Sequence, residues 1–218
     1  MQKVKEKAPE IAIDCWVQGQ PSTLEQNRGN VILIEVFQVN CPGCFIHGFP
    51  EVIEVVQRFQ GEPLVTWGLA TAFEDFDKNN LQNLQKLLST GEVTGDTLAA
   101  MTQANLLDFN RLQYPIPFPI AWDKLVKCPN VVNEEDVQKI IRRDINNFDS
   151  LAKKTQEMIT NQVKAYLKQK MYTAQTFEAY GLRGTPSSIL IDKKGNVRYK
   201  LFGSGQGLEE VLELLLNE

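Results

Sequence analysis

The chain has 218 residues, a formal net charge of −4 at pH 7 and a pI of about 5.2. A hydrophobic content of 43% suits one globular domain with room for an insertion, and the lack of a basic excess argues against a nucleic-acid partner. No apolar run is long enough to span a bilayer. Residues 1–14 are charged and lack the apolar core of a signal peptide, which predicts a cytoplasmic protein, although a periplasmic chain trimmed of its leader would look the same.

The first third of the chain contains the strongest structural signals. We expect residues 1–7 to be frayed and solvated, and residues 11–17 to form a short strand. The apolar, β-branched run Val31–Phe37 predicts a strand buried on both faces of a parallel sheet. Apolar residues then recur at the spacing of an amphipathic helix: Phe45, Phe49, Val52, Ile53, Val56 and Phe59. The turn between this strand and this helix contains Cys41-Pro42-Gly43-Cys44.

The remaining elements complete an α/β pattern. Residues 64–71 predict a second buried strand, parallel to the first through a right-handed crossover. Helices are expected over residues 79–89 and 97–107, then an extended segment with three prolines over residues 114–122. Residues 124–172 predict a helical insertion, with or without a break near residues 149–150. A short helix, a hairpin of residues 188–192 and 197–202 and a C-terminal helix follow, so we predict a central mixed sheet flanked by helices.

The paired cysteines predict redox chemistry. A helix N-terminus stabilises a thiolate, and the thiolate is the nucleophile in disulfide exchange. We therefore expect Cys41, the first and more exposed thiol, to have a lowered pKa and to attack, and Cys44 to resolve the resulting mixed disulfide. A metal site would need two further ligands, and the chain offers only the scattered Cys15, Cys128 and His47. An inert pair is the third interpretation.

Two further features carry a resemblance to a known family. Glu35 lies six residues before Cys41 on the predicted buried strand, and Gly184-Thr185-Pro186 precedes another apolar run, residues 187–192. With the paired cysteines, these residues resemble the thioredoxin superfamily, in particular its redoxin branch of TlpA/ResA-like and AhpC/TSA-like proteins. The resemblance covers residues 8–73, 114–123 and 177–218. It implies a thioredoxin-like fold with an added helical insertion, thiol–disulfide oxidoreductase activity, and neither a metal nor an organic cofactor.

The resemblance also implies roles for single residues. Glu35 would relay a proton to Cys44, and its buried strand position should raise the pKa of its carboxyl group. Pro186 would follow a cis peptide bond and leave the backbone of Thr185 free to pair with an extended client. Client contacts would include Thr185 and Pro186 and, beside the disulfide, Asn40, Pro42 and Gly43.

Three positions depart from the family pattern. Asn40 stands where a tryptophan is usual, and we expect this change to alter the exposed surface beside the disulfide. Gln38 occupies the place of the threonine of a typical peroxiredoxin, which counts against peroxidase chemistry. Pro50 comes six residues after Cys44, one later than the pattern, and inside a helix it would remove a hydrogen bond and cause a kink.

The favoured function is reduction or exchange of disulfides in protein clients, with electrons from another dithiol or a small thiol. One alternative is a peroxidase in which Cys44 traps the sulfenic acid of Cys41. Another is a non-catalytic binding module or redox sensor. The insertion has three interpretations: a cap that selects the partner, a homodimer surface, or a helical pair that covers extra sheet. We expect His47 to be a surface or packing residue, and Cys15 and Cys128 to be passive thiols.

Overall fold

A computed structural model describes residues 2–128 and 132–218. The chain forms two compact units, Met1–Leu125 together with Ala174–Glu218, and Val126–Thr173. The second unit spans the region predicted as an insertion, residues 124–172. Residues 129–131 of that prediction, like residue 1, lie outside the described part of the chain.

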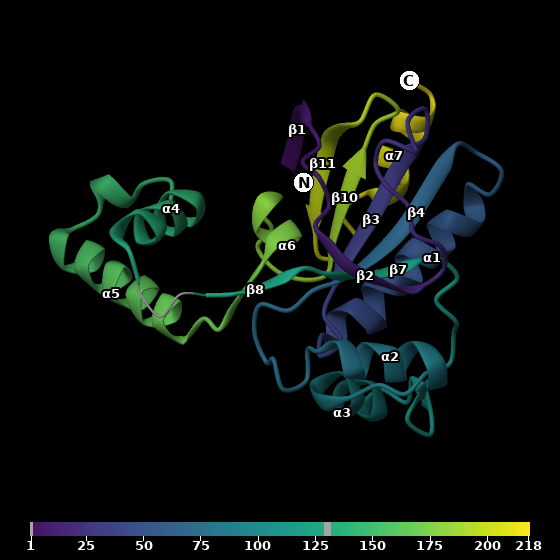
Figure 1. The fold of residues 1–218 in the computed structure, drawn as a ribbon, viewed down its shortest axis with the longest axis horizontal. Coiled ribbons are helices and arrows are strands. Elements are labelled where there is room, and N and C mark those ends of the chain that lie inside the picture. The colour runs from purple at the N-terminus through teal and green to yellow at the C-terminus, as the bar shows by residue number, and fades with distance from the viewer. Residues whose placement is uncertain (1, 129–131) are drawn as a thin grey trace. The chain divides into compact units, whose positions relative to one another are not determined.

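The first unit is built on a seven-stranded mixed sheet in the order β1-β11-β10-β3-β4-β7-β2 (Figure 1). The strands are β1 (Gln2–Lys7), β2 (Ile13–Gln18), β3 (Val31–Phe37), β4 (Leu64–Ala70), β7 (Ile120–Asp123), β10 (Ser187–Ile191) and β11 (Asn196–Phe202). β4 pairs in parallel with β3 and with β7, whereas the other pairs in this sheet are antiparallel. All seven residues of β3 are buried, which confirms the predicted central strand.

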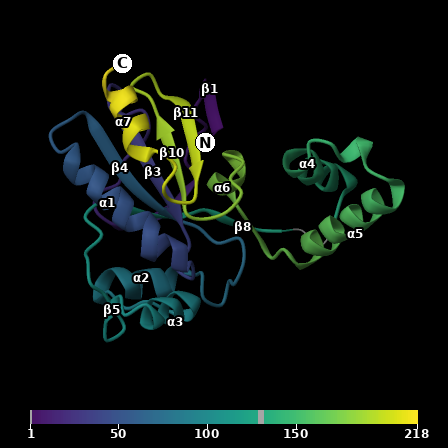
Figure 2. The same ribbon diagram turned by 180° about the vertical axis from the view of Figure 1, so that it is seen from behind.

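Helices cover both faces of this sheet. α1 (Phe49–Arg58) and α7 (Leu208–Leu216) lie on one face, and α6 (Gln175–Ala179) lies on the other (Figure 2). Because successive strand residues point to opposite faces, Leu33 and Phe37 of β3 pack toward α1 while Ile34 packs toward α6. α2 (Leu81–Thr90) and α3 (Gly95–Gln103) add Leu84 and Met101 to the α1 side. Between α3 and β7, the short strands β5 (Leu107–Asp108) and β6 (Arg111–Leu112) form a pair that the sequence patterns did not predict.

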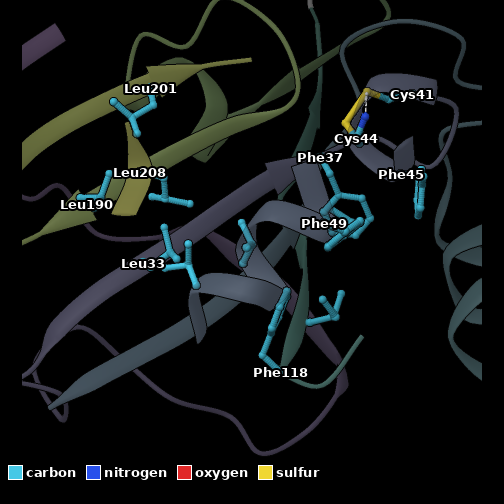
Figure 3. Packing of buried hydrophobic residues seen from close by; sticks show 14 of the residues in the cluster. Leu33, Phe37, Cys41, Cys44, Phe45, Phe49, Phe118, Leu190, Leu201 and Leu208 are labelled. Carbon is cyan, nitrogen blue, oxygen red and sulfur yellow. Dashed lines mark hydrogen bonds between the residues drawn. A yellow bond between two sulfur atoms is a disulfide. The ribbon is translucent and has the colours of Figure 1, made fainter. Parts of the chain in front are cut away.

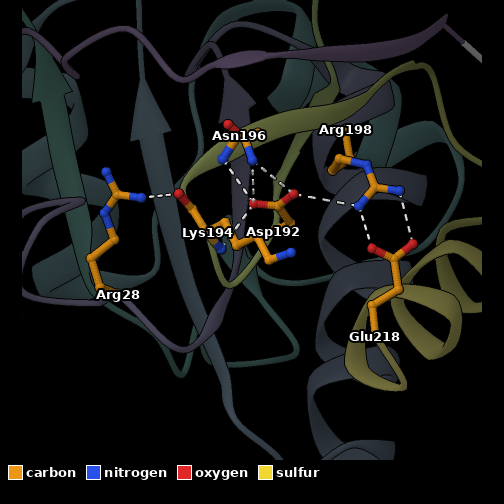
Figure 4. A network of polar contacts seen from close by, with 6 residues as sticks. All are labelled: Arg28, Asp192, Lys194, Asn196, Arg198 and Glu218. Atoms are coloured by element: carbon orange, nitrogen blue, oxygen red, sulfur yellow. Dashed lines mark hydrogen bonds and ion pairs between the residues drawn. The ribbon is translucent and has the colours of Figure 1, made fainter.

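The predicted hairpin of β10 and β11 is confirmed, and polar contacts hold its turn. Asp192 Oδ1 accepts the backbone N–H groups of Lys194 at 2.9 Å and Asn196 at 2.8 Å (Figure 4). The Arg198 guanidinium bridges Asp192 and Glu218, which ties the hairpin to the C-terminus of the chain. The hairpin matters for the site because β10 begins directly after Pro186.

The expectation that residues 1–7 are frayed is wrong for Gln2–Lys7. These residues form β1 and pair antiparallel with β11, from Gln2 opposite Lys200 to Lys7 opposite Asn196. Without β1, β11 would be the edge of the sheet, with a row of unpaired backbone groups. Backbone hydrogen bonding of this kind leaves no hydrophobic pattern in a short charged segment, so the pattern-based prediction missed it.

The second unit is a helical pair. α4 (Glu134–Asp144) packs against α5 (Lys153–Gln169), and the short 3₁₀ segment Phe148–Ser150 between them shows that the helix is broken there, which the sequence had left open. Asn133 caps α4, since its side chain accepts the N–H of Asp136 at 2.7 Å. β8 (Leu125–Lys127) and β9 (Tyr172–Ala174) pair at the junction with the first unit. In the part of the chain that the structure describes, no helix has the length and apolar character needed to cross a membrane.

Candidate functional site

Cys41 and Cys44 form a disulfide immediately after β3, at the start of the helix (Figure 3). Their Cα atoms are 5.4 Å apart, and the N–H of Cys44 points at Cys41 Sγ across 3.3 Å. Cys41 is 8% exposed and Cys44 is 1% exposed. Cys41 is therefore the sulfur that a second molecule reaches first, whereas Cys44 is sealed inside the apolar cluster with Phe37, Phe45 and Phe49.

The helix that carries Cys44 begins at Pro42 and contains a π-turn near its N-terminus. Cys44–Gly48 is a five-residue π-helix, in which the N–H of Phe49 donates to the carbonyl of Cys44, and α1 continues from Phe49. Pro50 is the second residue of α1, which continues directly from the π-helix, so it lies inside a continuous helix as predicted. Because proline has no N–H, this position lacks one helical hydrogen-bond donor. π-turns are rare, occur mostly as single turns inside α-helices and are frequent at functional sites.

Glu35 lies beneath this turn as a buried acid. It is 2% exposed, and it stands directly opposite Ser188 in the pairing of β3 with β10. Ser188 Oγ donates a hydrogen bond to Glu35 Oε2 at 2.6 Å. Burial raises the pKa of Glu35 to about 7, with the bond from Ser188 acting to lower it and the charge of Glu51 acting to raise it. Glu35 can therefore exchange a proton near neutral pH.

Pro186, Glu35 and the π-turn meet at one place. The Thr185–Pro186 peptide bond is cis. A Cβ atom on Gly48 would lie 3.0 Å from both Glu35 Oε1 and Pro186 Cβ, and one on Gly43 would lie 3.7 Å from Pro186 Cδ. The backbone of the motif therefore approaches the acid and the proline closely, and Thr185 beside them is partly exposed.

Asn40 is buried, with only 7% of the residue exposed, so it contributes little surface of its own beside the disulfide. Asn40 Oδ1 accepts the N–H of Asp96 at 2.6 Å, and Nδ2 donates to the carboxylates of Asp75 at 3.0 Å and Asp96 at 3.4 Å. Its backbone N–H donates to Asn79 Oδ1 at 2.7 Å. A Cβ atom on residue 95 would overlap Asn40 Oδ1, so only a glycine at this position allows Asn40 to approach the N–H of Asp96. Asn40 ties the motif to the loop after β4 and to the start of α3.

The other singled-out residues lie around or away from the disulfide. Gln38 is buried, and its side chain accepts the N–H of Phe73 at 3.0 Å. His47 is exposed on the π-turn. Cys15 is a partly exposed free thiol on β2, at the edge of the sheet. Cys128 belongs to the second unit, where its sulfur lies 3.2 Å from Thr173 Oγ1.

Two contacts of this site were not anticipated from the sequence. Ser188 could have been found from its place two residues after Pro186, at the start of the predicted hairpin. Tyr114, whose hydroxyl donates to the carbonyl of Phe45 at 2.5 Å, offers no such signal because 69 residues separate the two partners.

The sheet, the helix-start disulfide and the proline loop together define a thioredoxin-like α/β protein. No protein-family model matches the chain, and no curated protein matches it. Solved structures do match. A thioredoxin-like superfamily protein is 26% identical with a TM-score of 0.57, over 98% of this chain and 97% of that chain. A thiol-disulfide isomerase from Corynebacterium glutamicum is 24% identical with a TM-score of 0.57, over 96% of each chain.

A third structure shows how far the fold extends beyond sequence similarity. An uncharacterized conserved protein from Geobacillus kaustophilus is 13% identical with a TM-score of 0.51, over 100% of this chain and 87% of that chain. The thioredoxin-like resemblance and the α/β fold class inferred from the sequence are confirmed.

Proposed function

We propose that the protein is a thiol–disulfide oxidoreductase that reduces or exchanges disulfides in protein clients. The observation that carries this proposal is the Cys41–Cys44 disulfide at a helix start, with the more exposed sulfur first and the buried acid Glu35 beneath the turn. A helix N-terminus favours the thiolate form of Cys41, and we expect its pKa to lie below that of a free cysteine.

The reaction starts from the dithiol form. The Cys41 thiolate attacks a client disulfide, forming a Cys41–client mixed disulfide and releasing one client thiolate. The Glu35 carboxylate takes the proton of the Cys44 thiol, and the Cys44 thiolate attacks Cys41 Sγ. This second step breaks the mixed disulfide, releases the second client thiolate and closes the Cys41–Cys44 bond. Two electrons pass from the protein to the client, and the proton of Cys44 remains on Glu35 while the client leaves as two thiolates.

The client is proposed to lie along the exposed side of the motif. Thr185, Pro42 and Gly43 are partly exposed around the disulfide, and Pro186 approaches the Gly43 backbone. An extended client strand pairing with the Thr185 backbone would place its disulfide next to Cys41. Asn40 takes part indirectly, by holding the motif against its neighbouring loops.

The electron donor is proposed to be another dithiol or a small thiol, and the direction to be client reduction in the cytoplasm. The reduction potential of the Cys41–Cys44 couple, titrated against a dithiol buffer, tests both. A value near that of thioredoxin, about −270 mV, supports a cytoplasmic reductant. A value near that of a strong periplasmic oxidant, about −120 mV, reverses the direction and contradicts the cytoplasmic placement.

The activity itself is tested by reduction of insulin disulfides with a dithiol as electron donor. We expect Cys41→Ser to abolish the reaction and Cys44→Ser to accumulate a mixed disulfide through Cys41, identified by mass spectrometry. Cys15→Ser and Cys128→Ser are matched controls, since both thiols are free in the structure, and they should retain full activity. Insulin reduction that survives Cys41→Ser contradicts the proposal. Rapid peroxide consumption by the dithiol form would instead favour the peroxidase alternative, and failure to form the disulfide would favour a binding module or sensor.

A further inference from the structure

The π-turn leaves one backbone carbonyl without its usual donor. In an α-helix, the carbonyl of Phe45 would accept the N–H of Phe49, but that N–H donates to Cys44. In the π register, the donor would be residue 50, which is Pro50 and has no N–H. The combination of a π-turn at Cys44 with a proline at position 50 therefore withholds both helical donors from Phe45 O.

Tyr114 satisfies this carbonyl from another part of the chain. Its hydroxyl donates to Phe45 O at 2.5 Å, from the segment between β6 and β7. Tyr114 is partly buried against the same apolar cluster that contains Cys41 and Cys44. Burial raises the pKa of the Tyr114 hydroxyl above its ordinary value, so the group stays protonated and remains a donor.

The bond acts on the peptide group between Phe45 and Ile46, one residue beyond Cys44. The Phe45 side chain is fully buried against Phe37 and Phe49, which leaves the turn little freedom on that side. At its far end, Gly48 of the same turn abuts Glu35 and Pro186. The conformation of the π-turn therefore sets where Cys44 stands relative to Cys41, to the acid and to the proline.

We propose that Tyr114 is a positioning residue for the Cys41–Cys44 couple, whose hydroxyl holds the π-turn in the conformation that the disulfide requires. This inference rests on the proposed function and adds a residue that acts through the backbone. When the disulfide is reduced, the two sulfurs separate beyond bonding distance and the turn has to adjust. A bond that restrains the turn in its disulfide conformation favours the oxidised form.

The test compares Tyr114→Phe with a matched control. Tyr180→Phe removes the same kind of bond, from a hydroxyl to the backbone carbonyl of Pro9 at 2.7 Å, on the other face of the sheet. Both variants should lose a similar amount of stability in urea, because each leaves a carbonyl unpaired. We expect only Tyr114→Phe to shift the equilibrium constant with dithiothreitol, by about two- to tenfold toward the dithiol form. A tenfold shift corresponds to a rise of about 30 mV in the reduction potential of the Cys41–Cys44 couple.

Two results would overturn the inference. One is an equilibrium constant for Tyr114→Phe that equals the wild-type value; the other is an equal shift in Tyr180→Phe. The dithiothreitol equilibrium can be measured whether or not the protein reduces insulin, so failure of the proposed function and failure of the Tyr114 role give different results.

Pro50→Ala provides a second, independent test. This variant restores an N–H at position 50, which can donate to Phe45 O in the π register. The effect of Tyr114→Phe on the equilibrium constant should therefore shrink by more than half in the Pro50→Ala background. An effect of undiminished size in that background would contradict the idea that Tyr114 replaces a missing backbone donor.

Discussion

Replacing Glu35 with glutamine tests the electrostatics of the site through the stability of the protein. Burial raises the pKa of Glu35 from its ordinary value of 4.5 to about 7 in the folded protein. Below about pH 4.5 the carboxyl is protonated in both the folded and the unfolded states, and its burial carries no charge penalty. Above about pH 7 it is ionised in both states, and the folded state bears the full cost of a buried charge.

The magnitude follows from the two pKa values. Each pKa unit corresponds to 1.36 kcal/mol, so a change from 4.5 to about 7 corresponds to roughly 3 kcal/mol of unfolding free energy. The wild type loses this amount relative to Glu35→Gln as the pH rises from about 4.5 to about 8. Glutamine keeps the size of the side chain and can still hydrogen-bond Ser188, so packing should change little.

The measurement is urea unfolding followed by tryptophan fluorescence across that pH range. The three tryptophans, Trp16, Trp67 and Trp122, all belong to the first unit, so the signal reports the unit that contains Glu35. Glu54→Gln is the matched control, because Glu54 is exposed on α1 and the variant removes the same charge without changing a buried site. A pH-independent difference between Glu35→Gln and wild type would refute the reasoning.

Two further substitutions examine the surroundings of Glu35. Ser188→Ala removes the donor that lowers the pKa of Glu35, so this variant should lose stability at a higher pH than the wild type; an unchanged or lower midpoint in the same urea series would contradict the role of this hydrogen bond. Gly48→Ala places a methyl group 3.0 Å from Glu35 Oε1 and Pro186 Cβ, and we expect it to cost about 1–2 kcal/mol of unfolding free energy. Gly48 has helical backbone angles, where Gly→Ala normally stabilises, so a more stable variant would show that the close approach is not tight.

Local sequence signals predicted much of the fold and the core of the candidate site. The uninterrupted apolar run of β3 and the helical spacing after it predicted a strand–turn–helix unit, because burial on both faces or on one stripe imposes those patterns. The position of Cys41 and Cys44 in that turn predicted a helix-start disulfide. Glu35 could be recognised for a similar reason, since an acid inside an otherwise apolar strand must be buried with it.

The tertiary structure decided everything that depends on long-range contacts. β1 is held by backbone pairing with β11, nearly two hundred residues away, and backbone pairing leaves no trace in side-chain pattern. The sequence pattern gave no sign that Asn40 is buried. It contacts Asp75 and Asn79 of the loop after β4 and Asp96 of α3. Its burial depends on partners that converge only in three dimensions.

The same holds for the fine geometry of the site. The sequence by itself determined that a proline stands six residues after Cys44, but the π-turn that accommodates it was set by tertiary packing. Only the folded chain brings Ser188 to Glu35 and Tyr114 to the Phe45 carbonyl. Sequence pattern encodes which face of an element is buried, whereas the donor that satisfies a buried polar group is chosen by the packing of elements distant in the chain.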